Sequence, residues 1–89
     1  MIFDKVKVKD IKVQIGQTVR VLRKNNKLTQ QELGDLLNLS RITIQNLEAG
    51  KNFTIDTLLL VLQHFDLLNE LNQEIVQFKK TNSDLKSLY

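Results

Sequence analysis

The chain has 89 residues, the length of one small domain, and this length predicts a single modest core. With 42% hydrophobic and 26% charged residues, its composition is typical of a globular domain and excludes a disordered chain. The lack of cysteine and the single histidine exclude a disulfide framework, a thiolate metal site and a histidine cluster. We therefore expect neither a metal nor a cofactor.

The net charge of +3 is unevenly distributed along the chain. Residues 1–53 carry ten basic and five acidic side chains, and residues 54–89 carry three and five, so the two parts sum to +5 and −2. This asymmetry indicates that one part faces a polyanion. No signal-peptide pattern and no apolar run long enough to span a bilayer is present, so we expect a soluble, cytoplasmic protein without membrane contact.

Zero prolines and three glycines favour helices over turn-rich β architectures. Residues 1–10 form an N-terminal arm in which lysine and valine alternate over residues 5–9, a strand-like spacing that is too short to stand alone. Three interpretations of the arm remain open: a frayed terminus, an edge strand that pairs in a dimer, and a basic arm lying on DNA.

The first helix is predicted to begin after Asp10, a suitable N-cap, and to end near Asn25 or Asn26, which tolerate a left-handed conformation. Its apolar face consists of Ile11, Ile15, Val19 and Leu22.

A second helix is predicted from Gln30 to about Leu37. Thr29 and Glu32 have the spacing of a capping box, and Leu28 and Leu33 have that of a hydrophobic staple.

The third and fourth helices are predicted from the same start signals. Ser40 caps a helix from Arg41 to about Ala49 that ends at Gly50, and Thr54 caps one from Ile55 to about His64. The fourth helix is apolar nearly all round. Ile55, Leu58, Leu59 and Leu62 form one face, and Leu60 and Val61 point elsewhere. Because such a helix needs two partners, we expect the second to be another copy of the chain.

A fifth helix carries an apolar stripe of Leu68, Leu71, Ile75 and Phe78, followed by a polar tail over residues 79–89.

The segment of about residues 30–49 has the pattern of a helix-turn-helix. Gly34 allows a close helix crossing, Asn38 lies in the turn, and Leu33, Leu37, Ile44 and Leu47 fill the space between the helices. Arg41, Gln45 and Asn46 remain on the outer side. In such a motif the second helix enters the major groove of DNA, and the N-terminus of the first approaches the phosphates.

The stretch from Ile15 to about Ile75, which runs through TQQELGDLLNLSRITIQNLEAGK, resembles the Cro and lambda-repressor family of helix-turn-helix regulators, also called the xenobiotic-response-element family. The resemblance departs from the usual pattern at Asn38, where the family most often has glycine. It implies an all-α, five-helix fold, a homodimer and a palindromic DNA operator. We thus expect an arm at 1–10, a domain at 11–78 with the helix-turn-helix at about 29–49, and a tail at 79–89.

The resemblance also assigns roles to individual residues. Base-edge contacts fall on Arg41, Ile42, Gln45 and Asn46, and phosphate contacts on Thr29, Gln30, Thr43, Lys51 and Asn52. Arg23 and Glu48 match an ion pair that orients the third helix. Three of these assignments have alternatives: Ile42 is a scattered surface residue or packs on the second helix, Lys51 is a solvated lysine, and Thr29 only caps.

The predicted dimer interface consists of Leu60, Val61, His64, Leu68, Leu71 and Ile75. His64 is interpreted as an interface or surface residue, because no second histidine or cysteine can join it at a metal. No phosphate-binding glycine loop or paired catalytic group is present, so we expect no enzyme activity.

Three functions fit this pattern. The first is a homodimeric repressor that reads a palindromic operator. The second is an antitoxin resembling HipB, which binds a toxin protein and regulates its own operon. The third is a restriction-modification controller protein.

Overall fold

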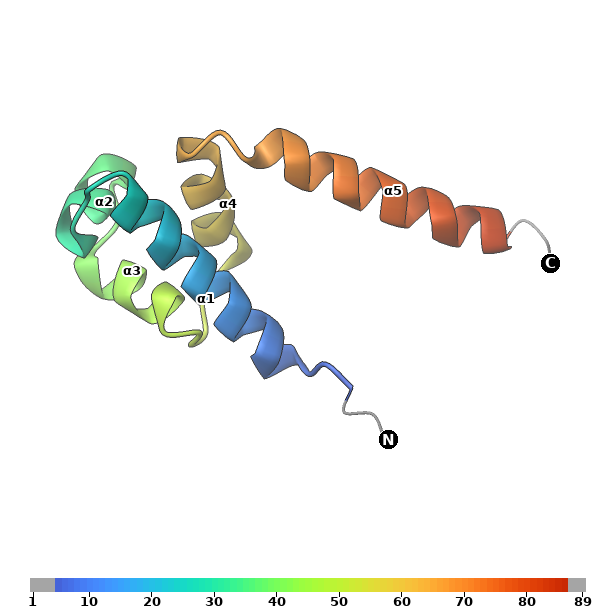
Figure 1. Cartoon of the computed structure of the whole chain (residues 1–89), viewed down its shortest axis with the longest axis horizontal. Helices are drawn as coiled ribbons and strands as arrows, with labels where there is room; N and C mark the ends of the chain where they lie inside the picture. Colours follow the sequence, from blue (N-terminus) through green and yellow to red (C-terminus); the bar gives the residue numbers. More distant parts are fainter. Residues whose placement is uncertain (1–4, 87–89) are drawn as a thin grey trace.

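The computed structural model describes residues 5–86 of the chain, with side chains through Ser83. These residues form five α-helices and no strand: α1 (Val8–Asn25), α2 (Gln30–Leu37), α3 (Arg41–Glu48), α4 (Ile55–His64) and α5 (Leu68–Lys86). Helices α1 to α4 pack into one body, and α5 extends away from it (Figure 1). The predicted all-α, five-helix fold is confirmed.

Three helices begin where their caps predict. The side chain of Thr29 accepts a hydrogen bond from the backbone N–H of Glu32, at 3.0 Å. Ser40 and Thr54 accept in the same way at the starts of α3 and α4. Because each cap satisfies a backbone donor that the helix leaves unpaired, these short side chains fix the positions of α2, α3 and α4 along the chain.

The core lies within the four-helix body. Its fully buried side chains come from α1 to α4 and are Val19, Leu33, Ile44, Leu47 and Val61. Among the residues whose side chains the structure describes, α5 contributes none of the fully buried set. The core that supports the helix-turn-helix is therefore built by the first four helices.

The predicted start of the first helix is wrong by three residues. Helix α1 begins at Val8 with Lys7 as its N-cap, and Asp10 lies inside the first turn. The carboxylate of Asp10 accepts a hydrogen bond from the backbone N–H of Lys7 at 2.9 Å, so it stabilises the helix start from within. Residues 5–9, whose spacing is strand-like, therefore do not form a strand. The rest of the predicted arm, residues 1–4, lies outside the described residues.

The first helix ends at Asn25 as predicted, but another residue makes the turn. Lys27 has the left-handed conformation, with φ 58°, whereas φ of Asn26 is −95°. The side chain of Asn26 instead donates a hydrogen bond to the carbonyl of Leu22, at 2.8 Å. The asparagine thus closes the helix with its side chain, and the chain reverses one residue later.

One expectation about the C-terminal part is corrected. Val61 is fully buried in the body, so the prediction that it lies at a dimer interface is wrong. It faces the core together with Thr57, whose hydroxyl is 3.0 Å from that of Thr54, and Ile55 is 69% exposed instead. The buried face of α4 includes the polar residue Thr57, whose hydroxyl is satisfied by nearby Thr54, so the sequence pattern did not identify this face as the buried one.

The described part of the predicted polar tail, residues 79–86, is helical. Helix α5 continues to Lys86, because no glycine or proline lies between residues 68 and 86 to stop it.

Candidate nucleic-acid interface

Helices α2 and α3 meet across a very short turn. A β-carbon added at Gly34 would lie 2.6 Å from the carbonyl oxygen of Leu39, so only glycine permits this approach. Asn38 takes the left-handed conformation at φ 58° and ψ 41°, and the N–H of Leu39 donates to the carbonyl of Gly34 at 2.8 Å. Both residues that were predicted to shape the turn therefore do so.

A second close approach was missed by sequence reasoning. Gly16 is buried where α1 crosses the end of α3, and a β-carbon there would lie 2.7 Å from the carbonyl oxygen of Leu47 and collide with that of Glu48. The only signal in the sequence is an isolated glycine inside a helical pattern, which costs helix stability and so has a packing reason. Gly16 sets how closely α1 supports α3.

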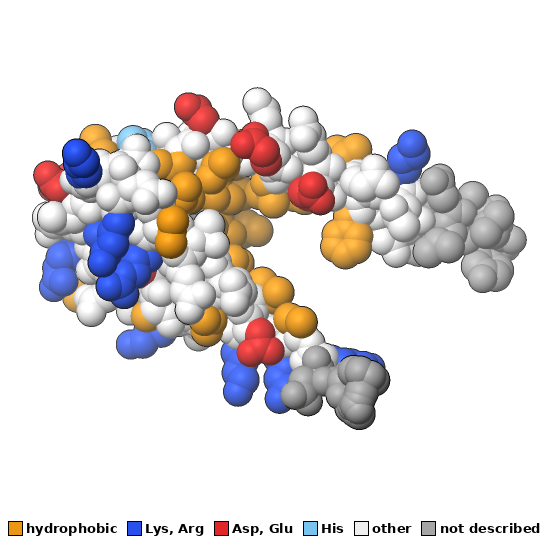
Figure 2. All heavy atoms as spheres, in the orientation of Figure 1, with side chains coloured by type: hydrophobic (Ala, Val, Ile, Leu, Met, Phe, Trp, Pro, Cys, Tyr) orange, Lys and Arg blue, Asp and Glu red, His pale blue; other side chains and the backbone are white. Residues whose placement is uncertain are grey.

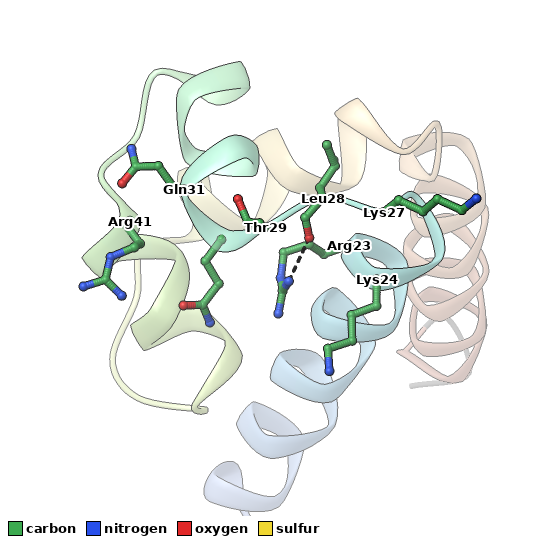
Figure 3. Close-up of a pocket in the computed structure, with 8 residues that line it drawn as sticks. Arg23, Lys24, Lys27, Leu28, Thr29, Gln31 and Arg41 are labelled. Atoms are coloured by element: carbon green, nitrogen blue, oxygen red, sulfur yellow. Dashed lines mark hydrogen bonds between the residues drawn. The ribbon is translucent and has the colours of Figure 1, made fainter.

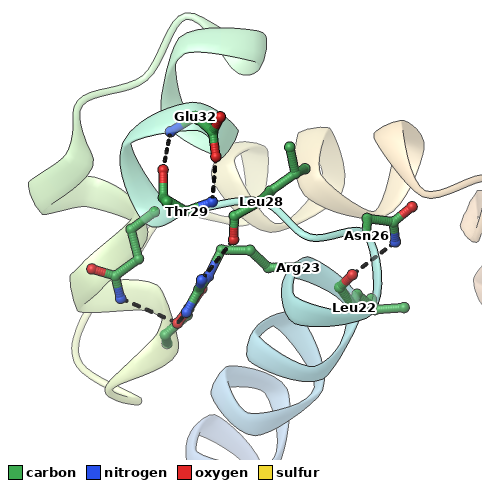
Figure 4. A network of polar contacts seen from close by, with 8 residues as sticks. Leu22, Arg23, Asn26, Leu28, Thr29 and Glu32 are labelled. Atoms are coloured by element: carbon green, nitrogen blue, oxygen red, sulfur yellow. Dashed lines mark hydrogen bonds and ion pairs between the residues drawn. The ribbon is translucent and has the colours of Figure 1, made fainter.

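The predicted contact between Arg23 and Glu48 is present, and it is buried. Arg23 Nε lies 2.6 Å from Glu48 Oε2, Nη2 donates to Oε1 at 2.9 Å, and the two side chains are 10% and 5% exposed (Figure 4). Arg23 Nη1 also donates to the carbonyl of Leu28 at 2.8 Å. The hydrogen bonds with Glu48 raise the pKa of Arg23 above its ordinary value, so the guanidinium stays charged.

The same carboxylate ties α2 to the pair. Gln30 Nε2 donates to Glu48 Oε1 at 3.1 Å, so the ends of α1 and α3 and the start of α2 meet at one charged group. Gln30, predicted as a phosphate contact, therefore has a structural partner as well. This network fixes the direction of α3 relative to the N-terminus of α2.

The predicted base contacts lie on the outer side of α3. Arg41 and Gln45 are exposed, Asn46 is half-buried, and Ile42 is 57% exposed. The exposure of Ile42 is inconsistent with its being packed on the second helix. The start of α3 thus presents a guanidinium, an apolar side chain and an amide to solvent on one short helix.

The predicted phosphate contacts lie around the two helix starts and the end of α3. Thr29 is the N-cap of α2, Thr43 shares a 2.9 Å hydrogen bond with Ser40, and Lys51 is exposed. The side-chain oxygen of Asn52 accepts from Lys12 Nζ at 2.7 Å, which adds a lysine of α1 to this region.

A basic groove of about 700 Å³ runs past the N-terminus of α2. Arg41 lies on one side of Thr29, and Lys24 at the end of α1 and Lys27 in the turn that follows lie on the other (Figure 3). The groove is lined by Arg23, Lys24, Lys27, Leu28, Thr29, Gln30, Gln31 and Arg41. Sequence reasoning missed Lys24, Lys27 and Gln31, although the basic run before the cap was a usable signal.

Charge is divided over the surface in the same way as along the sequence. Lys and Arg side chains gather along α1 and at its end beside the helix-turn-helix, and carboxylates lie along the start of α5 (Figure 2). Positive charge beside a helix N-terminus, where unpaired N–H groups point outward, forms a site for phosphate oxygens. Within residues 5–86 there is no group of three residues suited to hold a metal ion, and no described helix could cross a membrane.

Comparison with known proteins agrees with this geometry. The helix-turn-helix family model HTH_3 matches residues 19–68, more than half of the chain. No curated protein matches the chain. The matched segment contains α2, the turn, α3 and α4, together with both members of the buried ion pair. The chain therefore belongs to the lambda-repressor-like, xenobiotic-response-element type of helix-turn-helix proteins, a family of DNA-binding transcriptional regulators.

Proposed function

We propose that the protein is a homodimeric repressor that reads a palindromic operator, with α3 of each copy in the major groove. The observation that carries this proposal is the outer side of α3. Arg41, Ile42 and Gln45 are exposed beside the basic groove, while Ile44 and Leu47 of the same helix are fully buried. The buried side chains hold α3 in place, so the exposed side chains that would contact bases keep a fixed direction.

The exposed side chains of α3 have the chemistry of base readers. Arginine can donate twice to guanine, and glutamine and asparagine can pair with adenine through two hydrogen bonds. Ile42 can pack on the methyl group of thymine, which gives a reason for its exposure in water. Each good pair contributes about 1–3 kcal/mol of discrimination against a wrong base.

Phosphate contacts surround this helix. Beside the Thr29 side chain, the N-terminus of α2 offers the backbone N–H groups of Gln30 and Gln31 to one phosphate, since the capping box already uses those of Thr29 and Glu32. Lys24, Lys27 and Lys51 add positive charge on either side. A single short helix reads few bases, so two copies would read half-sites about one helical turn apart, roughly 34 Å. The dimer would then repress in the cytoplasm by covering a promoter.

The direct test is footprinting on the DNA upstream of the protein's own gene. We expect a protected palindrome at low salt. Its protection should weaken as salt rises, because binding to phosphates releases counterions and is therefore opposed by added salt. Uniform weak binding to every fragment, without a protected site, would show that the protein does not read sequence and would refute the proposal.

Replacing Arg41 with alanine is expected to weaken operator binding about tenfold and to leave binding to unrelated DNA nearly unchanged, because a base contact is lost. Fluorescence anisotropy with both DNAs measures the two affinities. Arg20→Ala is the matched control, since Arg20 is also exposed but does not line the groove. Equal losses on both DNAs would place Arg41 on phosphate instead.

Replacing either Lys24 or Lys27 with alanine should reduce the steepness of the salt dependence by about 0.9 in log K against log salt, since each removes one phosphate contact. The loss should be the same on operator and unrelated DNA. Lys80→Ala, an exposed lysine of α5, serves as the control and should leave the slope unchanged. An unchanged slope in both groove variants would remove these lysines from the interface.

A further inference from the structure

Helix α5 has far more apolar surface than its contacts with the body explain. Its start is anchored, because Leu68 is half-buried and Leu71 closes one side of an apolar groove of about 280 Å³ between α1 and α4. Every side chain from Asn72 to Ser83 is exposed. An isolated helix of this length is marginal in water, so the exposed part needs a partner.

The exposed part carries a coiled-coil repeat. The residues Leu68, Leu71, Ile75, Phe78 and Asn82 follow one another at alternating spacings of three and four, and Leu85 holds the next position on the helix. Ile75 is 54% and Phe78 is 74% exposed. Apolar residues at the first and fourth positions of a heptad form the contact stripe between paired helices. We call Leu71, Ile75, Phe78 and Asn82 the α5 stripe.

The residues that flank the stripe favour one orientation of a second copy. In this register Glu74 precedes a first heptad position and Lys79 follows a fourth. In a parallel pair, Glu74 of each copy faces Lys79 of the other, which gives two attractive contacts. In an antiparallel pair, Glu74 would face Glu74 and Lys79 would face Lys79, so both attractive contacts would be lost.

Asn82 supplies a second argument for a parallel pair. A single polar residue at the first heptad position fixes register and two-strandedness in parallel coiled coils, since it finds its partner only in the same residue of the other helix. In the single chain, the side-chain amide of Asn82 donates a hydrogen bond to the backbone carbonyl of Phe78, at 2.8 Å.

We propose that α5 pairs with α5 of a second copy as a short parallel coiled coil through the α5 stripe. This inference rests on the proposed homodimer and names its interface. The body is joined to the start of α5 (Figure 1), so parallel pairing places both bodies at the same end of the coil. Antiparallel pairing would separate them by the helix length, about 28 Å for 19 residues.

The repeat covers fewer than three heptads, so the dimer is weak enough to dissociate on dilution. Sedimentation over a concentration series tests the interface with two neighbouring substitutions. Ile75→Asp should raise the dimer dissociation constant at least about 100-fold, since it removes apolar contact and adds charge in both copies. Val76→Asp is the matched control, because Val76 is 45% exposed on the same helix but lies outside the stripe, and it should leave the constant within about threefold.

Disulfide trapping tests orientation, and the absence of native cysteine makes each introduced one unique. Asn82→Cys should crosslink the two copies under mild oxidation, whereas Gln73→Cys, on the opposite side of the helix, should not. Glu74→Lys should weaken the dimer, even though it removes a like-charge pair with Glu70 along the helix. Adding Lys79→Glu should restore it.

Three outcomes overturn the proposal. They are a monomer at every concentration, equal effects of Ile75→Asp and Val76→Asp, and a dimer that Asn82→Cys does not crosslink. Thermal unfolding of Ile75→Asp verifies that the body is intact, since residue 75 lies outside the core. A wild-type dimer with the expected crosslink but no protected DNA site would refute the repressor function and leave the α5 interface standing. A monomeric protein that still protects a specific DNA site would overturn both the α5 interface and the homodimer, and would leave sequence-specific DNA binding standing.

Discussion

Replacing Glu48 with alanine is expected to lower the free energy of unfolding by about 3 kcal/mol, because it leaves the buried guanidinium of Arg23 without its counter-charge. The value lies at the lower end for a broken buried pair, since Arg23 keeps its hydrogen bond to the carbonyl of Leu28 and remains 10% exposed. For a domain of this size the melting temperature should fall by roughly 12–24 °C.

Thermal and urea unfolding measure this loss, and two further variants identify its cause. Asp35→Ala removes an exposed carboxylate of α2 and should cost less than about 0.5 kcal/mol. The double variant Arg23→Met, Glu48→Leu removes both charges and should recover most of the stability, because a well-packed apolar pair can replace a buried ion pair at little cost. A Glu48→Ala protein as stable as the wild type would contradict this prediction and show that water solvates the Arg23 guanidinium once the carboxylate is gone.

The double variant also separates stability from orientation. Glu48 joins α3 to both α1 and α2 through hydrogen bonds of fixed direction, which apolar side chains cannot reproduce. If the pair orients α3, the double variant should fold well and still bind the operator more weakly than the wild type. Unchanged affinity would reduce the pair to a packing role.

The sequence predicts the helix-turn-helix well because its signals are local. Thr29, Ser40 and Thr54 each satisfy a backbone N–H three residues on, and Asn38 takes the left-handed conformation at the turn. Such signals need no knowledge of what lies across the fold. The ion pair of Arg23 and Glu48 came from the family resemblance, because residues 25 apart carry no local sign of contact.

The missed features depend on contacts between distant segments. Gly16 is required by carbonyl oxygens of α3 that lie more than 30 residues away, and Lys24 and Lys27 join the groove only because α1 ends beside α2. Val61 was assigned to the wrong side because Thr57, a polar residue, faces the core with its hydroxyl satisfied by Thr54. In each case tertiary packing overrode a pattern that was readable along one helix.

Replacing Gly16 with valine tests the most demanding of these contacts and should destabilise the protein by about 3 kcal/mol. Helix propensity alone predicts the opposite, because a glycine inside α1 is worse than almost any other residue. The added β-carbon would overlap the backbone carbonyl oxygens of Leu47 and Glu48, which cannot swing aside as a side chain can. Helix α1 would therefore move away from α3 and pull Arg23 from Glu48.

The control is Gln17→Val, which places the same side chain at the next, exposed position of α1 and should cost less than about 0.7 kcal/mol. Gly16→Ala should lower the free energy of unfolding by an amount between those of Gly16→Val and Gln17→Val. Because it also pulls Arg23 from Glu48, part of this loss should be the same loss that Glu48→Ala causes. The combined variant Gly16→Ala, Glu48→Ala is thus expected to be less unstable than the sum of its parts. Full additivity would mean that α1 stays in place and that Gly16 and the ion pair support α3 independently.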